Sequence, residues 1–262
     1  MGGTTFQPDL LTGKVAFVAG ASSGINLAIA ETLGRHGARL ALISRNADKI
    51  AAAAGGLAAM NIECIGQAAD VRDFAAVDAA MQAAVARFGA IDIVISGAAG
   101  NFVAAARDMS ANGFKTVVDI DLIGSFNVLR ASYPHLRKPG ATLISITAPQ
   151  AVRPTVMQAH VCAAKAGINM LTKVLALEWG PEGIRVNAIS PGPIAGTEGM
   201  ARLAPNAEAE AAVKWAIALR RYGEKSEIAD AALYLCSDSA RYVTGTVLDC
   251  DGGAGLAISA LG

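Results

Sequence analysis

The stretch Val15-Ala-Phe-Val-Ala-Gly-Ala-Ser-Ser-Gly-Ile25 decides which fold this chain is expected to adopt. Its first five residues are a continuous apolar run, which is typical of a strand buried on both faces of a parallel sheet. Gly20 and Gly24 then frame a turn, and apolar side chains at every fourth position from Ile25 predict a helix. A helix that starts beside such a turn offers free N–H groups and a positive dipole end to a phosphate, although the turn could also hold no ligand.

The same alternation of apolar strand and amphipathic helix continues along the chain. Further strands are predicted at 40–43, 62–67, 91–95, 141–146, 184–189 and 243–249. We therefore expect an α/β fold, a Rossmann-like doubly wound parallel sheet of about seven strands with helices on both faces. Residues 1–262 are expected to form a single dinucleotide-binding and catalytic domain, with a lid around residues 196–220. Residues 200–220 of this lid, rich in alanine and arginine, are expected to be helical, and a long helix is predicted at about 112–136.

Composition excludes several classes of protein. Of 262 residues, 53% are hydrophobic and 17% are charged, and 22 basic side chains balance 22 acidic ones, so nucleic acid is not an expected partner. No apolar run approaches the roughly 18 residues needed to span a bilayer. The four cysteines lack metal-type spacing and are interpreted as reduced thiols, which predicts a cytoplasmic protein without a metal. Neither a secretory signal nor a peroxisomal address is expected at the ends of the sequence.

The end of the second predicted strand bears on which dinucleotide binds. Ser44 and Arg45 stand where an acidic residue would bind the ribose hydroxyls of NAD. A hydroxyl and a planar cation suit a 2′-phosphate, so the cofactor is predicted to be NADP(H). Arg45 could also be merely a solvated residue. Asp70, which closes the third strand, could likewise be a cap for the next helix.

Motifs between residues 12 and 253 together resemble the short-chain dehydrogenase/reductase family. Lys165, on a helix that follows Ser145 and a loop with two prolines, has the family's lysine position. The family usually carries a tyrosine four residues earlier, where this chain has Val161. The other matching motifs are Gly20…Gly24, Asp70-Val71, Ala98-Ala99-Gly100, Glu178-Trp179-Gly180, Arg185-Val186-Asn187, Pro191-Gly192-Pro193 and Asp251-Gly252-Gly253.

Within that family the chain is most similar to NADPH-dependent 2,4-dienoyl-CoA reductases, especially the peroxisomal type, which also lack the tyrosine. The matching pieces are Ala98-Ala-Gly-Asn-Phe102, Asp119-Ile-Asp121, Ser145-Ile-Thr147, His160 and Pro191-Gly-Pro-Ile-Ala-Gly-Thr-Glu-Gly199. The resemblance implies reduction of a 2,4-dienoyl-CoA to a 3-enoyl-CoA in fatty-acid β-oxidation, by a homotetramer. Alternatives are a reductase of another activated alkene or carbonyl, such as a 3-oxoacyl thioester, or a non-catalytic NADP(H)-binding protein.

Three catalytic residues are carried over from the resemblance. Lys165 is expected to bind the nicotinamide ribose and to bring a positive charge under the reacting ring. Asp121 and Lys165 are expected to order a water that protonates the substrate, although they could simply form a buried ion pair. Ser145 is expected to donate to the substrate oxygen, or else to be a strand-end hydroxyl that bonds backbone.

The resemblance also implies a binding site for each ligand. His160 could equally be a packed or capping histidine, and Gln150 stands where the mitochondrial reductase carries a tyrosine. Asn26 replaces the third glycine of the cofactor turn, where its side chain could crowd the pyrophosphate or add a hydrogen bond. The predicted cofactor-binding residues are Gly20, Ser22, Ser23, Gly24, Ile25, Ser44, Arg45, Asp70, Val71, Ala98, Ala99, Gly100, Lys165, Pro191, Gly192, Ile194 and Thr197. The predicted substrate-binding residues are Asn101, Phe102, Gln150 and His160.

Overall fold

A seven-stranded parallel sheet is the centre of the computed structural model, which describes residues 6–197, 199–200 and 204–256. The strand order is β3-β2-β1-β4-β5-β6-β7, so the order reverses between β1 and β4, as in a doubly wound Rossmann-like fold. This confirms the predicted fold class. The strands are β1 Val15–Ala19, β2 Arg39–Ser44, β3 Cys64–Ala68, β4 Ile93–Ser96, β5 Thr142–Ile146, β6 Arg185–Pro191 and β7 Val247–Cys250.

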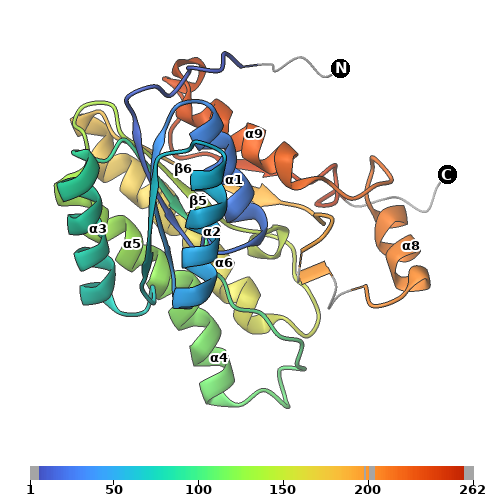
Figure 1. Ribbon diagram of the computed structural model, residues 1–262. Helices are drawn as coiled ribbons and strands as arrows, with labels where there is room; N and C mark the ends of the chain where they lie inside the picture. The colour runs from blue at the N-terminus through green and yellow to red at the C-terminus, as the bar shows by residue number, and fades with distance from the viewer. Residues whose placement is uncertain (1–5, 198, 201–203, 257–262) are drawn as a thin grey trace.

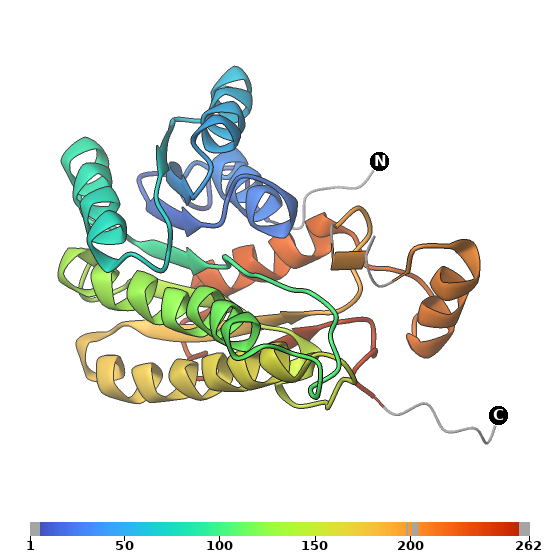
Figure 2. The same ribbon diagram turned by 90° about the horizontal axis from the view of Figure 1, so that it is seen from below.

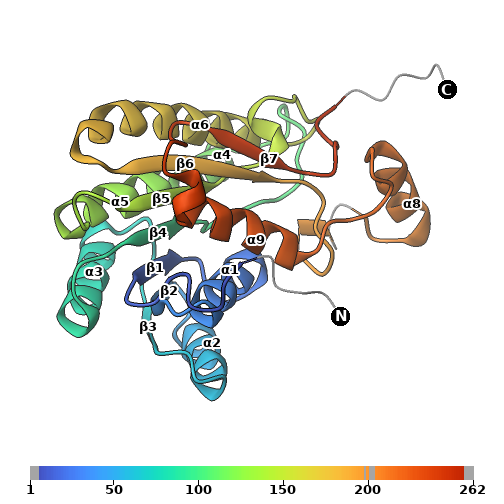
Figure 3. The same cartoon turned by 90° about the horizontal axis from the view of Figure 1, so that it is seen from above.

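Helices cover both faces of the sheet and enclose two hydrophobic cores (Figures 2 and 3). On one face α1, α2 and α9 pack over the strands, and on the other face α3, α5 and α6 do so. Because both faces are covered, the central strands β1 and β5 are buried along their whole length and do not alternate between buried and exposed residues. The helices are α1 Gly24–Arg35, α2 Ala47–Ala59, α3 Phe74–Phe88, α4 Ala111–Val118, α5 Gly124–Ser132, α6 Ala159–Trp179, α8 Ala207–Ala216 and α9 Lys225–Cys236.

The structure corrects the predicted helix over residues 112–136. In its place α4 and α5 are joined by a π-helical turn, Asp119–Ile123, and Tyr133–His135 form a final 3₁₀ turn. A π-helical turn inserts extra backbone without interrupting the helical path, so hydrophobic periodicity does not reveal it. The turn contains Asp121, and such turns are frequent at functional sites.

The segment predicted as a lid contains a shorter helix than the sequence suggested. Residues 200–220 were expected to be helical, whereas α8 covers Ala207–Ala216 and lies to one side of the sheet (Figure 1). Residues 198 and 201–203 of this segment lie outside the described residues. Closure of the segment over a ligand stays a prediction.

Three broader properties concern the described ranges as a whole. Every helix in them is too short or too polar to cross a membrane. The same ranges contain no group of three or more His, Cys, Asp or Glu side chains that could hold a metal ion. All four cysteines are free thiols.

Candidate active site

The carboxyl ends of the central strands bring the predicted catalytic residues together. Parallel strands end at the same edge of the sheet, and in folds of this type ligands bind outside that edge. Ser145 near the end of β5 pairs in register with Ser96 at the end of β4. Helix α6 runs back from this edge and carries Lys165 on its second turn.

Lys165 and Asp121 form an ion pair in the interior of the protein. Their side chains are 7% and 1% exposed, and Lys165 Nζ lies 3.2 Å from Asp121 Oδ2. Lys165 Nζ also donates to the Ile146 carbonyl at 3.1 Å, and Asp121 Oδ1 accepts from the Gly100 N–H at 2.7 Å. The direct ion pair that the sequence left as an alternative is therefore present. Mediation of proton transfer by an ordered water stays a prediction.

Val161 lies on the same face of α6 as Lys165, one turn before it, and is only 4% exposed. An aliphatic side chain neither gives nor takes a proton. The Oγ of Ser145 is also buried and has no hydrogen-bond partner among the described residues. The alternative in which this hydroxyl bonds backbone is therefore wrong, and the hydroxyl is free to donate to a ligand oxygen.

His160 is packed inside the protein at the start of α6. It is fully buried, and neither ring nitrogen has a hydrogen-bond partner of good geometry among the described residues. Its ring makes an edge contact with Phe102, with centroids 4.3 Å apart. Burial lowers the pKa of His160 below its ordinary value, so the imidazole is neutral at pH 7. Gln150 is held by Gln158, because its Nε2 donates to Gln158 Oε1 at 3.1 Å.

The glycine turn after β1 has the shape and the room that a dinucleotide requires. Gly20 and Gly24 have φ angles of 79° and 66°, which favour glycine. A Cβ added at Gly24 would meet nothing within 4 Å, so backbone is open to a ligand where α1 begins. The Ser23 side chain makes no capping hydrogen bond to α1, which leaves first-turn N–H groups for a pyrophosphate. The residues present therefore fit the predicted cofactor.

Asn26 adds hydrogen bonds beneath this turn. Its Nδ2 donates to the Gly97 carbonyl at 2.7 Å and to the Gly20 carbonyl at 3.3 Å. The side chain is 8% exposed, so it lies in the protein interior. Of the two effects that the sequence allowed, the structure favours the added hydrogen bond over crowding of the pyrophosphate.

Charged side chains surround the expected adenosine end. Arg72 Nη2 lies 2.6 Å from Asp70 Oδ2, and the hydrogen bonds from Arg72 lower the pKa of Asp70 below its usual range. The charge of Arg45 lowers that pKa further. The alternative role of Asp70 as a helix cap is wrong, because Asp73 caps α3 by accepting from the Ala76 N–H. Ser44 Oγ donates to a backbone carbonyl two residues further on.

Comparisons with known proteins agree with this geometry. The family model described as "Enoyl-(Acyl carrier protein) reductase" matches residues 20–255. The peroxisomal 2,4-dienoyl-CoA reductase of Pongo abelii is 47% identical over 254 residues, which cover 96% of this chain and 87% of that protein. The peroxisomal 2,4-dienoyl-CoA reductase of Arabidopsis thaliana is 42% identical over 258 residues, covering 95% and 86%.

This chain belongs to the short-chain dehydrogenase/reductase family. It is therefore an oxidoreductase. A solved short-chain dehydrogenase/reductase from Serratia marcescens superposes with a TM-score of 0.87 at 31% identity, covering 94% of this chain and 99% of that one. The citronellol catabolism dehydrogenase of Pseudomonas aeruginosa gives 0.83 at 30% identity, covering 96% and 98%.

The names of the relatives correct one expectation. Relatives at 42–47% identity are named peroxisomal enzymes, which points to peroxisomes and contradicts the predicted cytoplasmic location. That prediction used composition and reduced thiols, which do not distinguish one reducing compartment from another. Delivery to an organelle depends on an address read by a receptor, which the composition of a domain does not reveal.

Sequence reasoning missed several contacts that hold the site of this short-chain reductase in place. The Ile146 carbonyl holds the lysine ammonium, and the Asn127 amide donates to the Val71 carbonyl at 2.9 Å. Thr197 Oγ1, predicted to bond the cofactor, donates to the Ile194 carbonyl at 2.9 Å. Backbone acceptors have no sequence signature, so no motif could have identified these bonds.

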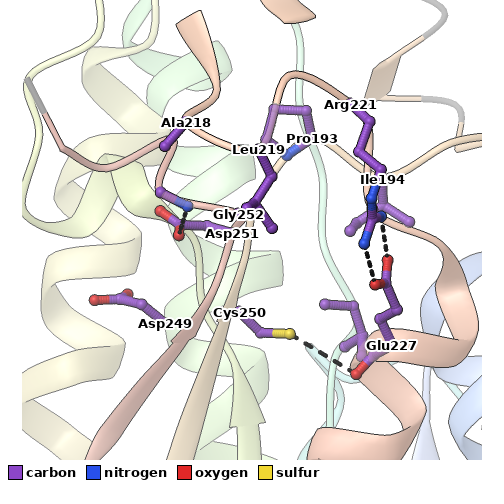
Figure 4. A pocket seen from close by; sticks show the side chains of 13 residues that line it. Pro193, Ile194, Ala218, Leu219, Arg221, Glu227, Asp249, Cys250, Asp251 and Gly252 are labelled. Carbon is purple, nitrogen blue, oxygen red and sulfur yellow. Dashed lines mark hydrogen bonds and ion pairs between the residues drawn. The ribbon is translucent and has the colours of Figure 1, made fainter. Parts of the chain in front are cut away.

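Two cavities lie beside the loops of the site. One of about 610 Å³ adjoins the loop after β5 and is lined by Ala105, Ala106, Gln150, Ala151, Val152, Pro154, Thr155, Val156, Met157, Ala159, Cys162, Ala163 and Ala166. The other, of about 470 Å³, lies beside Pro193 and Ile194 at the ends of β6 and β7 (Figure 4). Arg221 and Glu227 face each other across one side of the second cavity.

The Arg221–Glu227 ion pair is predicted to contribute to folding stability at neutral pH and to lose that contribution at low pH. Hydrogen bonds from Arg221 and from the Glu224 N–H lower the pKa of Glu227 to about 2. A depressed folded-state pKa contributes stability above the ordinary pKa of 4.5, and that stability is lost as pH falls towards 2. Because both side chains are about half exposed, Arg221→Ala should lower the Tm by only about 1–3 °C at pH 7.

Thermal denaturation at several pH values measures this contribution. The Tm difference between wild type and Arg221→Ala should be constant above pH 5 and should shrink as pH falls below 4. Arg35→Ala, which breaks the exposed ion pair with Glu31, is the matched control. A difference that stayed the same down to pH 2.5 would contradict the assignment.

Proposed function

We propose that this protein uses NADPH to reduce a 2,4-dienoyl-CoA to a 3-enoyl-CoA in fatty-acid β-oxidation. The observation that carries the proposal is the near full-length likeness to proteins named as 2,4-dienoyl-CoA reductases that produce (3E)-enoyl-CoA, at 42–47% identity. The geometry of the site supports the same reaction and assigns a task to each of its buried polar groups.

The site suits reduction of an activated alkene better than oxidation of an alcohol. Oxidation of an alcohol needs a base that takes the hydroxyl proton, and Val161 provides none at the usual place. Reduction of a conjugated thioester requires instead that negative charge be stabilised on the thioester oxygen and that a proton reach carbon. Ser145, with its buried and unpartnered hydroxyl, is the donor that we assign to that oxygen.

NADPH, when bound, supplies the hydride that the far end of the diene receives. The turn from Gly20 to Gly24 would hold its pyrophosphate, and Ser44 with Arg45 would hold its 2′-phosphate. Lys165 would bind the nicotinamide ribose, where its charge also favours electron flow towards the thioester. The Ile146 carbonyl and Asp121 fix the position of the ammonium group, so little reorganisation is needed during the reaction.

Delivery of the proton is assigned to water beside the Asp121–Lys165 pair. Asp121 Oδ1 is occupied by the Gly100 N–H, so Oδ2 and the ammonium are the groups that can order a water. A proton reaching the α carbon of the substrate from that water leaves the double bond between carbons 3 and 4. The relatives are named for a (3E)-enoyl product, whose double bond has the same position.

The acyl chain is proposed to lie against Asn101, Phe102 and Gln150. Phe102 is 37% exposed and its ring also contacts the buried His160 ring, so His160 would support the pocket wall without touching the substrate.

We also propose a homotetramer. Its support is a set of exposed apolar side chains on α4, α5 and α6, which assembly would bury. These side chains are Phe114, Phe126, Met170, Val174 and Leu177.

A direct assay tests the proposed reaction. Purified protein should oxidise NADPH, seen as loss of its absorbance, when 2,4-hexadienoyl-CoA or 2,4-decadienoyl-CoA is added. Mass spectrometry of the product should show a gain of two hydrogens and a 3-enoyl thioester. Turnover of 3-oxoacyl-CoA without turnover of either dienoyl-CoA would instead support a carbonyl reductase. Tight NADPH binding without turnover of any thioester would support a non-catalytic protein.

Arg45 is expected to determine the preference of this protein for NADPH over NADH. Arg45→Ala should weaken NADPH binding by about tenfold, the effect of losing one hydrogen bond to a charged group. NADH affinity should hardly change, because NADH has no 2′-phosphate. Binding titrations of both cofactors measure this, with Arg87→Ala at the far end of α3 as the matched control for loss of an exposed arginine. Equal loss of affinity for both cofactors would show that Arg45 does not contact the 2′-phosphate.

A further inference from the structure

The four residues Gly20, Asn26, Gly97 and Ala98 form a junction between the end of β1 and the end of β4, two adjacent strands. The Asn26 amide bridges the carbonyls of Gly20 and Gly97 inside the protein. A Cβ added at Gly20 would lie only 2.8 Å from the Ala98 backbone, so the two loops are in direct contact. We call this contact the Asn26 junction.

Gly97 provides the space that the Asn26 side chain occupies. A Cβ at Gly97 would lie 2.1 Å from Asn26 Oδ1 and 2.6 Å from its Cγ and Nδ2, which no real structure tolerates. In dinucleotide folds the third glycine of the turn allows the helix to pack closely against the sheet. Here the larger side chain, Asn26, belongs to α1, and the glycine that makes room for it, Gly97, follows the end of the neighbouring strand β4. Positions 26 and 97 are therefore sterically coupled.

The two ends of the loop after β4, residues 97–100, are hydrogen-bonded to different parts of the site. At Gly97 its carbonyl accepts from Asn26, and at Gly100 its N–H donates to Asp121 at 2.7 Å. Asp121 in turn contacts Lys165 at 3.2 Å. A continuous series of short contacts thus runs from the glycine turn to the buried ion pair.

We propose that Asn26 is a positioning residue, which sets the glycine turn and the loop 97–100 in register for NADPH binding. The backbone of that loop would pass beside the cofactor, while the turn would hold its pyrophosphate. Both surfaces must keep a fixed separation to contact one extended ligand. The Asn26 amide, in donating to both, sets that separation. The inference rests on the proposed function only in taking NADPH as the ligand.

Replacing Asn26 by alanine should weaken NADPH binding in the absence of any substrate. The change leaves the Gly20 and Gly97 carbonyls without their donor and opens a gap between the two loops. We expect the Kd for NADPH to rise about tenfold, consistent with loss of a buried hydrogen-bonding side chain. Fluorescence titration of bound NADPH measures the Kd, and thermal denaturation without cofactor measures folding stability.

Asn187→Ala is the matched control for a purely structural effect. Asn187 is a fully buried asparagine within β6 whose amide donates to the Val243 carbonyl at 3.0 Å, away from the site. Both variants should lower the Tm, but only Asn26→Ala should raise the Kd. Asn26→Gln, which keeps an amide on a longer side chain, should recover part of the affinity for NADPH but should still bind it less tightly than wild type does. An unchanged Kd in Asn26→Ala, with a Tm loss like that of Asn187→Ala, would overturn the proposal.

The steric coupling is tested by Gly97→Ala in two backgrounds. In the wild-type background this substitution should lower the Tm strongly, because the new methyl group meets Asn26. In the Asn26→Gly background the same substitution should cost little, because all three nearest atoms to the new Cβ belong to Asn26. An equal Tm loss in the two backgrounds would contradict the coupling.

These experiments test the role of Asn26 independently of the proposed reaction. Weakened NADPH binding in Asn26→Ala supports the positioning role even if dienoyl-CoA is not the substrate. Wild-type protein that did not bind NADPH would contradict the proposed function. The Tm comparison at position 97 would then still decide whether the two loops are coupled.

Discussion

Lys165→Ala should lower kcat for 2,4-dienoyl-CoA by at least about a hundredfold, because it removes the only positive charge assigned to the reacting centre. The ammonium is held by Ile146 and Asp121 in a buried position, where a charge acts more strongly than it would in water. The substitution also leaves Asp121 as an uncompensated buried carboxylate, so some loss of stability is expected. Single-turnover assays at saturating NADPH separate the chemical step from cofactor binding.

One further variant separates the charge of Lys165 from its volume, and a second is a control at another lysine. Lys165→Met keeps the aliphatic stem and should be nearly as inactive as the alanine variant. Lys173→Ala removes an exposed lysine from the same helix and should leave kcat unchanged. If Lys165→Met kept more than a tenth of the wild-type kcat at saturating cofactor, the charge would not be essential, and the proposed mechanism would be wrong.

Asp121→Ala should cause the largest loss of stability among the site variants, together with a strong loss of activity. The change leaves the Lys165 ammonium buried without its partner and removes the acceptor of the Gly100 N–H. Breaking a buried ion pair in this way costs about 3–5 kcal/mol, which corresponds to roughly 10 °C in Tm for a chain of this size. Thermal and denaturant unfolding measure the loss.

Asp121→Asn distinguishes the structural role of this residue from its proposed role in proton delivery. Asparagine keeps the volume and an oxygen for Gly100, so it should restore much of the stability but little of the activity. Asp119→Ala, two residues earlier in the same π-helical turn, is the matched control because Asp119 pairs with Lys115 near the surface. Wild-type activity in Asp121→Asn would exclude a role for the negative charge.

The sequence predicted the fold because the physical basis of that fold is local. Strands buried on both faces read as continuous apolar runs, and the helices between them show apolar residues at helical spacing. The π-helical turn could not be predicted in this way, since it changes backbone hydrogen bonding without changing the apolar pattern. The length of α8 was overestimated because an alanine-rich composition favours helix along the whole segment.

Candidate residues of the site were also found from the sequence, but their contacts were not. Gly20, Asp121, Ser145 and Lys165 stand in motifs, so their positions could be named in advance. Which of the two interpretations of Asp121 applied depended on Lys165, which is distant in the chain, and that of Ser145 depended on whether folding brings any partner to its hydroxyl. No propensity or spacing rule contains that information.

By itself the sequence determined the strand–turn–helix order, the two glycines that frame the turn after the first strand, and the absence of a tyrosine before Lys165, because each of these depends on residue type at one place. Only the tertiary structure decided that Asp121 and Lys165 meet directly, that the Ser145 hydroxyl has no partner among the described residues, and that Asn26 fits against Gly97. These are contacts between distant segments. Packing of the whole sheet and its helices places such segments within hydrogen-bonding distance of one another.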